Sequence, residues 1–253
     1  FSAFGRVFAP SWPMTFATLV LLGLFLSMGR WQWQRGESKQ LLWAQFENAA
    51  APVPSGSAPD FDALPRYSRV AFPGEFDGAR QFLIENRSYQ GRPGYEVLTL
   101  ARTRGGERIL VNRGWMPFTG YRDQLPDVSL STQPPGSSTI TGRIDELPVA
   151  GLASGRAPPA SGDAWPKVTS FPSHAQLQAA LGESISRRII LLDPQSPDGY
   201  VRDWKPPGME PARHFSYAIQ WWGFALVLLV LYFALNFRRV SCCQIQLPKP
   251  GAP

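Results

Sequence analysis

The stretch His214-Phe-Ser-Tyr-Ala-Ile-Gln-Trp-Trp-Gly223 opens a long apolar segment. From Phe215 to Phe237 the chain has 23 residues without a charge, and Arg238 and Arg239 close the run. An α-helix rises about 1.5 Å per residue, so this run can cross a hydrocarbon core of about 30 Å. We therefore predict a transmembrane helix over residues 213–237, followed by a tail at 238–253.

A second apolar run lies near the other end, where Arg6 and Arg30 enclose 23 uncharged residues. The segment after it, Gly29-Arg-Trp-Gln-Trp-Gln-Arg35, is bulky and charged and unlike a cleavage site. This favours an uncleaved transmembrane helix over 7–29 rather than a signal peptide, continued by a membrane-proximal helix over 30–50. Trp31 and Trp33 stand where an aromatic belt meets the lipid–water boundary.

Two spans place both termini on one side of the membrane. Arg6, Arg238 and Arg239 lie close to the spans, so the positive-inside rule predicts cytoplasmic termini. The intervening region is too long for its charges to set the orientation. Residues 51–212 should then form a periplasmic domain.

The charge distribution argues against a nucleic-acid partner. The chain has 253 residues and a formal charge of +6, yet residues 40–210 contain 17 Lys and Arg against 18 Asp and Glu. The excess positive charge flanks the membrane, and no basic patch remains. Both cysteines, Cys242 and Cys243, are adjacent in the tail, a spacing poorly suited to a structural disulfide. Idle or lipidated thiols are the plain interpretation, with copper or redox chemistry as the alternative.

The middle region reads as short strands separated by turns. A Pro/Gly/Ser linker covers 51–57, a Gly/Pro-rich loop covers 148–166, and one helix is expected at Ser173–Leu181, capped by Ser173. Gly105-Gly106 is the strongest hairpin signal. The fold class is α+β: two transmembrane helices flanking a mainly antiparallel, barrel- or sandwich-like domain. The candidate strands are Tyr67–Phe76, Gln81–Arg87, Tyr95–Arg102, Arg108–Asn112, Ser138–Glu146 and Arg188–Leu192.

Motifs for catalysis are missing from the sequence, which predicts that the chain is not an enzyme. There is no GxSxG elbow, P-loop, dinucleotide-binding glycine pattern or HExxH. The only histidines are His174 and His214. A Ser-His-Asp arrangement can assemble across a fold, so a membrane-tethered hydrolase is a third hypothesis. We expect His174 to be a solvated helix residue.

Two segments of the middle region contain candidate partner or structural residues. In Ile109–Pro117 a hydrophobic strand delivers Asn112 and Arg113 and ends with Trp115. The planar guanidinium of Arg113 suits an acidic partner or a propionate, and the alternative is a structural arginine at a strand end. In Pro73-Gly-Glu-Phe76, Glu75 is a possible partner for an arginine.

His214 is the candidate ligand for a metal-centred cofactor. Tyr217 and Trp221 follow it at i+3 and i+7 and share its helix face. A haem iron needs a neutral imidazole, an apolar slot and basic groups for the propionates. Arg213 offers the charge, and the end of the first span can supply an opposing wall through Trp31, Trp33 and Arg35. An interfacial anchor is the alternative interpretation of His214.

Four ordered motifs resemble the SURF1 family of cytochrome c oxidase assembly factors. They are Gly29-Arg-Trp-Gln-Trp-Gln-Arg35, Pro73-Gly-Glu-Phe76, Val111-Asn-Arg-Gly-Trp-Met-Pro117 and His214-Phe-Ser-Tyr-Ala-Ile-Gln-Trp-Trp222.

This resemblance implies an inner-membrane factor that delivers haem a to oxidase subunit I or stabilises it there. It would work with haem a synthesis and insertion factors, and His214 takes the position of the family's suggested haem ligand. The main rival is a scaffold without haem that holds assembly intermediates through protein contacts.

Overall fold

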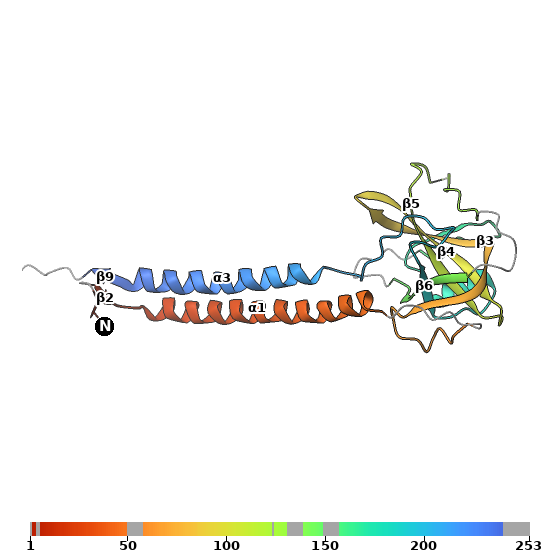
Figure 1. Cartoon of the computed structure of the whole chain (residues 1–253). Coiled ribbons are helices and arrows are strands. Elements are labelled where there is room, and N and C mark those ends of the chain that lie inside the picture. The colour runs from red at the N-terminus through yellow and green to blue at the C-terminus, as the bar shows by residue number, and fades with distance from the viewer. Residues whose placement is uncertain are drawn as a thin grey trace, which may run out of the picture. The chain divides into compact units, whose positions relative to one another are not determined.

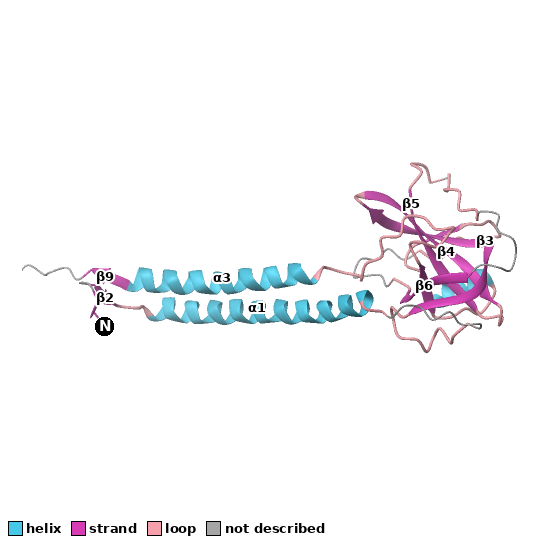
Figure 2. Ribbon diagram, viewed as in Figure 1, coloured by secondary structure: helices cyan, strands magenta, loops and turns pink. Residues whose placement is uncertain are grey.

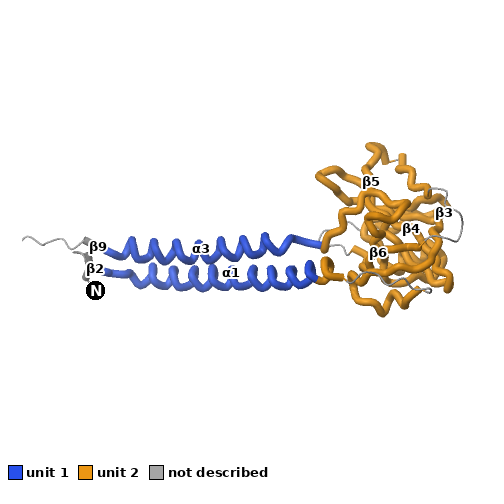
Figure 3. Tube along the Cα trace, in the orientation of Figure 1, with its two compact units in different colours: residues 1–44, 207–253 blue, residues 45–206 orange. Residues whose placement is uncertain are grey.

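The chain divides into two compact units (Figure 3). We call residues 1–44 and 207–253 the helical unit, and residues 45–206 the sheet unit. A computed structural model describes residues 2–3, 6–49, 58–122, 124–130, 139–148 and 157–239. The predicted linker at 51–57, the first residue of the strand predicted from Ser138, part of the 148–166 loop, and Cys242 and Cys243 lie outside these residues.

Two long helices make up most of the helical unit (Figure 1). Helix α1, Trp12–Glu47, is one continuous element of 36 residues, and α3 covers Pro211–Asn236. They run antiparallel: Thr15 Oγ1 lies 2.8 Å from Tyr232 OH near one end, and Lys39 Nζ donates to the Pro207 carbonyl at 2.9 Å near the other. The two uncharged runs therefore lie side by side. Strands β1 (Ser2–Ala3), β2 (Arg6–Phe8) and β9 (Phe237–Arg239) form a small antiparallel sheet.

Both helices have the character of membrane spans. Their most apolar windows reach mean hydropathies of 1.6 and 2.0, and only 11% of each window is buried. Large apolar side chains such as Leu19 and Leu226 are more than 60% exposed. The core helix of a soluble protein buries such residues, so the pair indicates membrane anchoring. The predicted boundary at residue 30 between span and proximal helix stays a prediction.

A six-stranded sheet forms the sheet unit (Figure 2). Five of its strands pair in a closed cycle, in the order β3–β4–β5–β8–β6 and back to β3. Strand β7 pairs with β3 in addition. Only β5–β8 and β3–β7 are parallel, which confirms the mainly antiparallel α+β class. A barrel or sandwich shape stays a prediction. The strands are β3 Arg69–Tyr89, β4 Arg92–Thr103, β5 Arg108–Pro117, β6 Thr139–Glu146, β7 Lys167–Thr169 and β8 Arg188–Leu192.

Two details of the strand prediction were wrong. The first two predicted strands are one strand, β3, because the Asp77–Gln81 segment is accommodated as a bulge and does not reverse the chain. The reversal comes later, at Gln90 and Gly91, whose φ angles of 49° and 76° suit a tight hairpin. Strand β7 was not predicted, because it has only three residues. The Gly105-Gly106 hairpin is confirmed between β4 and β5.

The central strands are buried on both faces. In β5, Ile109 and Val111 pack into one hydrophobic cluster and Leu110 into another. Helix α2, His174–Leu181, covers the second cluster through Leu177 and Leu181. Ser173 caps this helix in a capping box with Gln176, as the sequence predicted.

Candidate functional site

His214 on α3 is hydrogen bonded to Gln32 on α1. The distance from His214 Nδ1 to Gln32 Oε1 is 2.9 Å. An amide oxygen can only accept, so Nδ1 carries a proton, and in the neutral imidazole Nε2 then keeps its lone pair. Among the described residues, Nε2 has no hydrogen-bond partner. His214 lies beside the end of the uncharged run of α1, and it is half-buried.

Two stripes of contacts join α1 and α3, each with a seven-residue spacing. In the first stripe Gln32 meets His214, and seven residues away Phe25 meets Trp221, with ring centroids 5.8 Å apart. In the second, Gly36 faces Phe215 and Gly29 faces Trp222. A seven-residue repeat brings side chains back to nearly the same helix face, so the stripes run along the seam between the helices.

The second stripe is closely packed. A Cβ added at Gly29 would lie 2.3 Å from Trp222 Nε1, and one at Gly36 would lie 2.6 Å from the Phe215 ring. Trp33 covers this side, with ring centroids 4.8 Å from Phe215 and 5.6 Å from Trp222. The second stripe therefore leaves no space for a further side chain between the helices.

Tyr217 and Trp221 share the helix face of His214, but the predicted residues of α1 do not all lie beside them. Tyr217 is 41% exposed, and Trp221 packs on Phe25 in the first stripe. Trp33 belongs to the second stripe. Trp31 is about half exposed and lies 5.9 Å from the guanidinium carbon of Arg35. Arg213 and Arg35 are both exposed. The proposed opposing wall of Trp31 and Trp33 is therefore not a single surface.

The residues present fit an axial haem ligand on chemical grounds. The imidazole has an oxygen acceptor for Nδ1–H, which orients an axial histidine, and it has aromatic rings on its own helix face and exposed arginines nearby in the sequence that suit a macrocycle and its propionates. Gln32 was not among the predicted site residues. Its only sequence signal is its place as a polar residue between two tryptophans of the Gly29–Arg35 motif.

In the sheet unit Arg113 is enclosed within the fold. It is 1% exposed, and it donates from Nε to the Asp198 carbonyl at 2.6 Å and from Nη1 to Gln81 Oε1 at 2.9 Å and the Val128 carbonyl at 3.0 Å. Its guanidinium lies 4.9 Å from the Tyr200 ring. Burial lowers the pKa of Arg113, and the nearby Tyr200 and Asp198 act in the opposite direction. These contacts give Arg113 a structural role.

The other candidates of this unit have local contacts. Asn112 donates to Glu96 Oε2 at 2.8 Å, and Trp115 Nε1 donates to the Arg87 carbonyl at 3.3 Å. Glu75 is exposed, and no ion pair joins it to another described residue. Arg102 faces Glu75 in the β3–β4 register, but its side chain reaches Asp77 and Glu183 instead.

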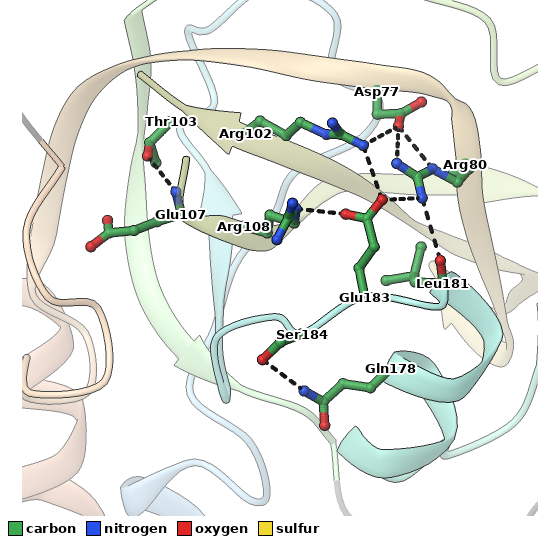
Figure 4. Close-up of polar contacts among 10 residues, drawn as sticks. All are labelled: Asp77, Arg80, Arg102, Thr103, Glu107, Arg108, Gln178, Leu181, Glu183 and Ser184. Carbon is green, nitrogen blue, oxygen red and sulfur yellow. Dashed lines mark hydrogen bonds and ion pairs between the residues drawn. The ribbon is translucent and has the colours of Figure 1, made fainter. Parts of the chain in front are cut away.

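An ion-pair cluster centred on Glu183 has no counterpart in the sequence motifs (Figure 4). Its carboxylate lies 2.7 Å from Arg80, 3.2 Å from Arg102 and 2.5 Å from Arg108. The hydrogen bond from Arg80, together with the charges of the three arginines, lowers the pKa of Glu183. Glu183 follows Gly182, the residue that ends α2, so the cluster fastens α2 to β3, β4 and β5.

His174, Ser186 and Asp62 come together without forming a catalytic triad. Ser186 Oγ donates to Asp62 Oδ1 at 2.7 Å, whereas His174 Nε2 faces the carbonyls of Ile185 and Ser186 at 3.0 and 3.1 Å. Nε2 is therefore a donor and cannot take the serine proton. His174 is not the solvated residue we expected, because its ring is half-buried and hydrogen bonded to the loop that follows α2.

Asp62 holds the same loop from the other side. Besides Ser186 it accepts from the backbone N–H of Arg187 at 2.9 Å. Burial raises the pKa of Asp62, but the hydrogen bonds from Ser186 and from the Arg187 and Arg188 backbone outweigh burial and lower it. In the described part of the chain, no three His, Cys, Asp or Glu side chains are grouped to hold a metal ion.

The comparisons with known proteins agree with the helix pair and its motifs. Residues 19–226 match the SURF1 family. The chain belongs to this family. SURF1 proteins are linked to cytochrome oxidase assembly and are assembly factors, not a known class of enzyme. The chain is also similar to uncharacterised SURF1-like proteins of Mycobacterium bovis and Mycobacterium tuberculosis, with 28% identity over 180 residues. The match covers 70% of this chain and 60% of the length of these relatives.

Proposed function

We propose that this chain binds haem a through His214 Nε2 and helps its insertion into, or retention by, subunit I of a haem–copper oxidase. The observation that carries the proposal is the hydrogen bond from His214 Nδ1 to Gln32, which leaves Nε2 free beside the end of an apolar span. Haem a is largely apolar apart from its propionates, so a ligand at the edge of the membrane suits its transfer between membrane proteins.

The chain's own residues would bind and orient the haem without making or breaking covalent bonds. His214 would ligate the iron, and the exposed faces of Tyr217 and Trp221 would contact the macrocycle. Arg213 and Arg35 are exposed and would pair with the propionates. When bound, the haem supplies an iron centre for transfer, and no reaction by this chain is implied.

The proposal includes a location. The chain would sit in the cell inner membrane with both termini cytoplasmic and the sheet unit periplasmic, which follows from Arg6, Arg238 and Arg239 beside the spans. Its partners would be oxidase subunit I, haem a synthesis and insertion factors, and membrane lipid. No nucleic-acid partner is proposed.

A scaffold without haem is the second candidate. The close glycine contacts of Gly29 and Gly36 make a helix pair that is complete by itself, and in this account the bond between His214 and Gln32 only holds the helices together. The two candidates differ in what happens when the imidazole is replaced by a side chain that can still bond Gln32.

The test is complementation of a bacterial strain that lacks this protein. We expect wild type to restore haem a in the oxidase of isolated membranes, whereas His214→Asn, which keeps a donor for Gln32, restores only a small fraction at an equal protein level. Full restoration by His214→Asn would overturn haem ligation and favour the scaffold. His174→Ala, which alters the only other histidine, is the matched control.

A further inference from the structure

The geometry points to Gln32 as a positioning residue for His214. We infer that it fixes the imidazole as the Nδ1–H tautomer and turns Nε2 toward the flank of the first stripe. This inference deepens the proposed function and rests on it for the identity of the ligand. The tautomer itself can be measured without any ligand.

The first step is the direction of the hydrogen bond. Gln32 Oε1 lies 2.9 Å from His214 Nδ1 and has no proton to give. The two nitrogens lie on either side of Cε1 and their outward directions diverge, so Nε2 points away from Gln32. Histidines that bind metals nearly always donate their other N–H to an oxygen acceptor, which sets the tautomer and the ring orientation.

The second step is the surface to which Nε2 belongs. His214, Tyr217, Trp221 and Phe224 follow one another at helical spacings of three, four and three residues, and so share a face. Phe25 on α1 packs on Trp221 and Phe224, with centroids 5.8 and 6.0 Å apart. Phe224 is 53% exposed. His214 therefore lies at one end of a row of aromatic rings on α3, in which Trp221 and Phe224 meet edge to face at 87° and Phe224 is exposed.

The third step separates this site from the rest of the seam. Trp33, Phe215 and Trp222 fill the second stripe, so the helix pair remains packed whether or not a ligand is present. Replacing Gln32 should therefore change the first stripe and leave the packing of the second stripe intact. A ligand could approach from the membrane without the helices separating.

The experiment uses the full chain in detergent, labelled with ¹⁵N-histidine, free of haem and at a pH at which imidazole is neutral. The His174→Ala variant assigns the His214 signals. We expect His214 to show a protonated Nδ1 and an unprotonated Nε2, and Gln32→Leu to move the ring toward the Nε2–H tautomer. Gln32→Glu keeps an acceptor and should preserve the wild-type tautomer. Gln34→Leu, on an exposed residue of the same turn, is the control.

A protonated Nε2 in wild type, or no change in Gln32→Leu, would overturn the inference. In a second arm each protein is titrated with haem a. We expect Gln32→Leu to weaken binding about 10- to 100-fold, the usual effect of losing such a partner, and Gln32→Glu to lower the reduction potential of the iron. Equal affinities for wild type and Gln32→Leu would also overturn it. Failure of wild type to bind haem a, with the expected tautomers in place, would refute the proposed function but not the role of Gln32.

Discussion

Arg113 in the sheet unit and His214 in the helical unit are both nitrogen-rich side chains beside aromatic rings, yet their contacts differ. Arg113 is enclosed, and its donors meet Asp198, Gln81 and Val128 within the unit. His214 is only half-buried, and the hydrogen bond to Gln32 uses one of its two ring nitrogens. A fully bonded side chain stabilises its own fold, whereas a spare lone pair held in a fixed direction can bind something else. Because of this difference, we propose ligand binding for the helical unit and a stabilising role for Arg113 in the sheet unit.

Replacing Arg113 should produce the largest loss of stability. Arg113→Met removes one donor from each of three oxygens, those of Asp198, Gln81 and Val128, and losing three such bonds costs on the order of 3 kcal/mol in total. Hydrogen exchange of the full chain in detergent should show faster exchange in β4 and β5. The exposed hairpin residue Arg92, changed to Met, should leave exchange unaltered. Equal protection in the two variants would contradict the structural role of Arg113.

Overpacking the second stripe between α1 and α3 should give the next largest loss of stability, now in the helical unit. A side chain at Gly29 would overlap the Trp222 ring, and overpacking of this kind costs about 1–3 kcal/mol. Gly29→Leu should therefore separate the helices and lower haem retention roughly tenfold. Gly23→Leu is the matched control because no atom lies within 4 Å of a Cβ built there. The measurement is haem content after purification, and similar losses in both variants would count against the packed seam.

The pH dependence of the sheet unit should be a smaller effect. The pKa values of Glu183 and Asp62 are lowered in the folded protein. Their stabilising contribution is therefore present above the ordinary carboxyl pKa of about 4 and is lost as the pH falls through the lowered values. Burial raises the pKa of Asp145, which acts in the opposite sense. The difference between wild type and Glu183→Gln in acid unfolding isolates the cluster: this difference should shrink as the pH falls, and a constant difference would contradict the role of its charge.

Glu75 should give the smallest effect of all. It is exposed and has no ion pair with another described residue, so Glu75→Gln should change the free energy of unfolding by less than about 0.5 kcal/mol. Denaturant titration of the full chain provides the comparison. A loss above 1 kcal/mol would restore the prediction that Glu75 pairs with an arginine.

Features that depend on one continuous segment were predictable from the sequence. The spans follow from uncharged runs, α2 from its cap at Ser173, and the β4–β5 hairpin from its two glycines. The bulge in β3 was missed because Asp77-Gly78 suits both a bulge within one strand and a turn between two strands. Strand β7 was missed because three residues carry no periodicity.

Features assembled from several segments were not predictable. Glu183 gathers arginines from β3, β4 and β5, and nothing in the spacing of these residues marks them as partners. His214 was a candidate from the sequence because it stands at the start of an uncharged run, with aromatic residues at helical spacing after it. Gln32 was not found, because only the antiparallel register of α1 and α3 brings it to the imidazole. The predicted wall of Trp31 and Trp33 ignored the helix period, which places the two side chains on different faces.

The most direct test of haem ligation by His214 is the pyridine haemochrome of the detergent-purified protein, co-expressed with haem a synthesis. Wild type, His214→Ala and His174→Ala should be compared at equal protein concentration. The account predicts haem a in wild type and His174→Ala and little in His214→Ala. Wild-type protein without haem a, or the same haem content in His214→Ala, would contradict it.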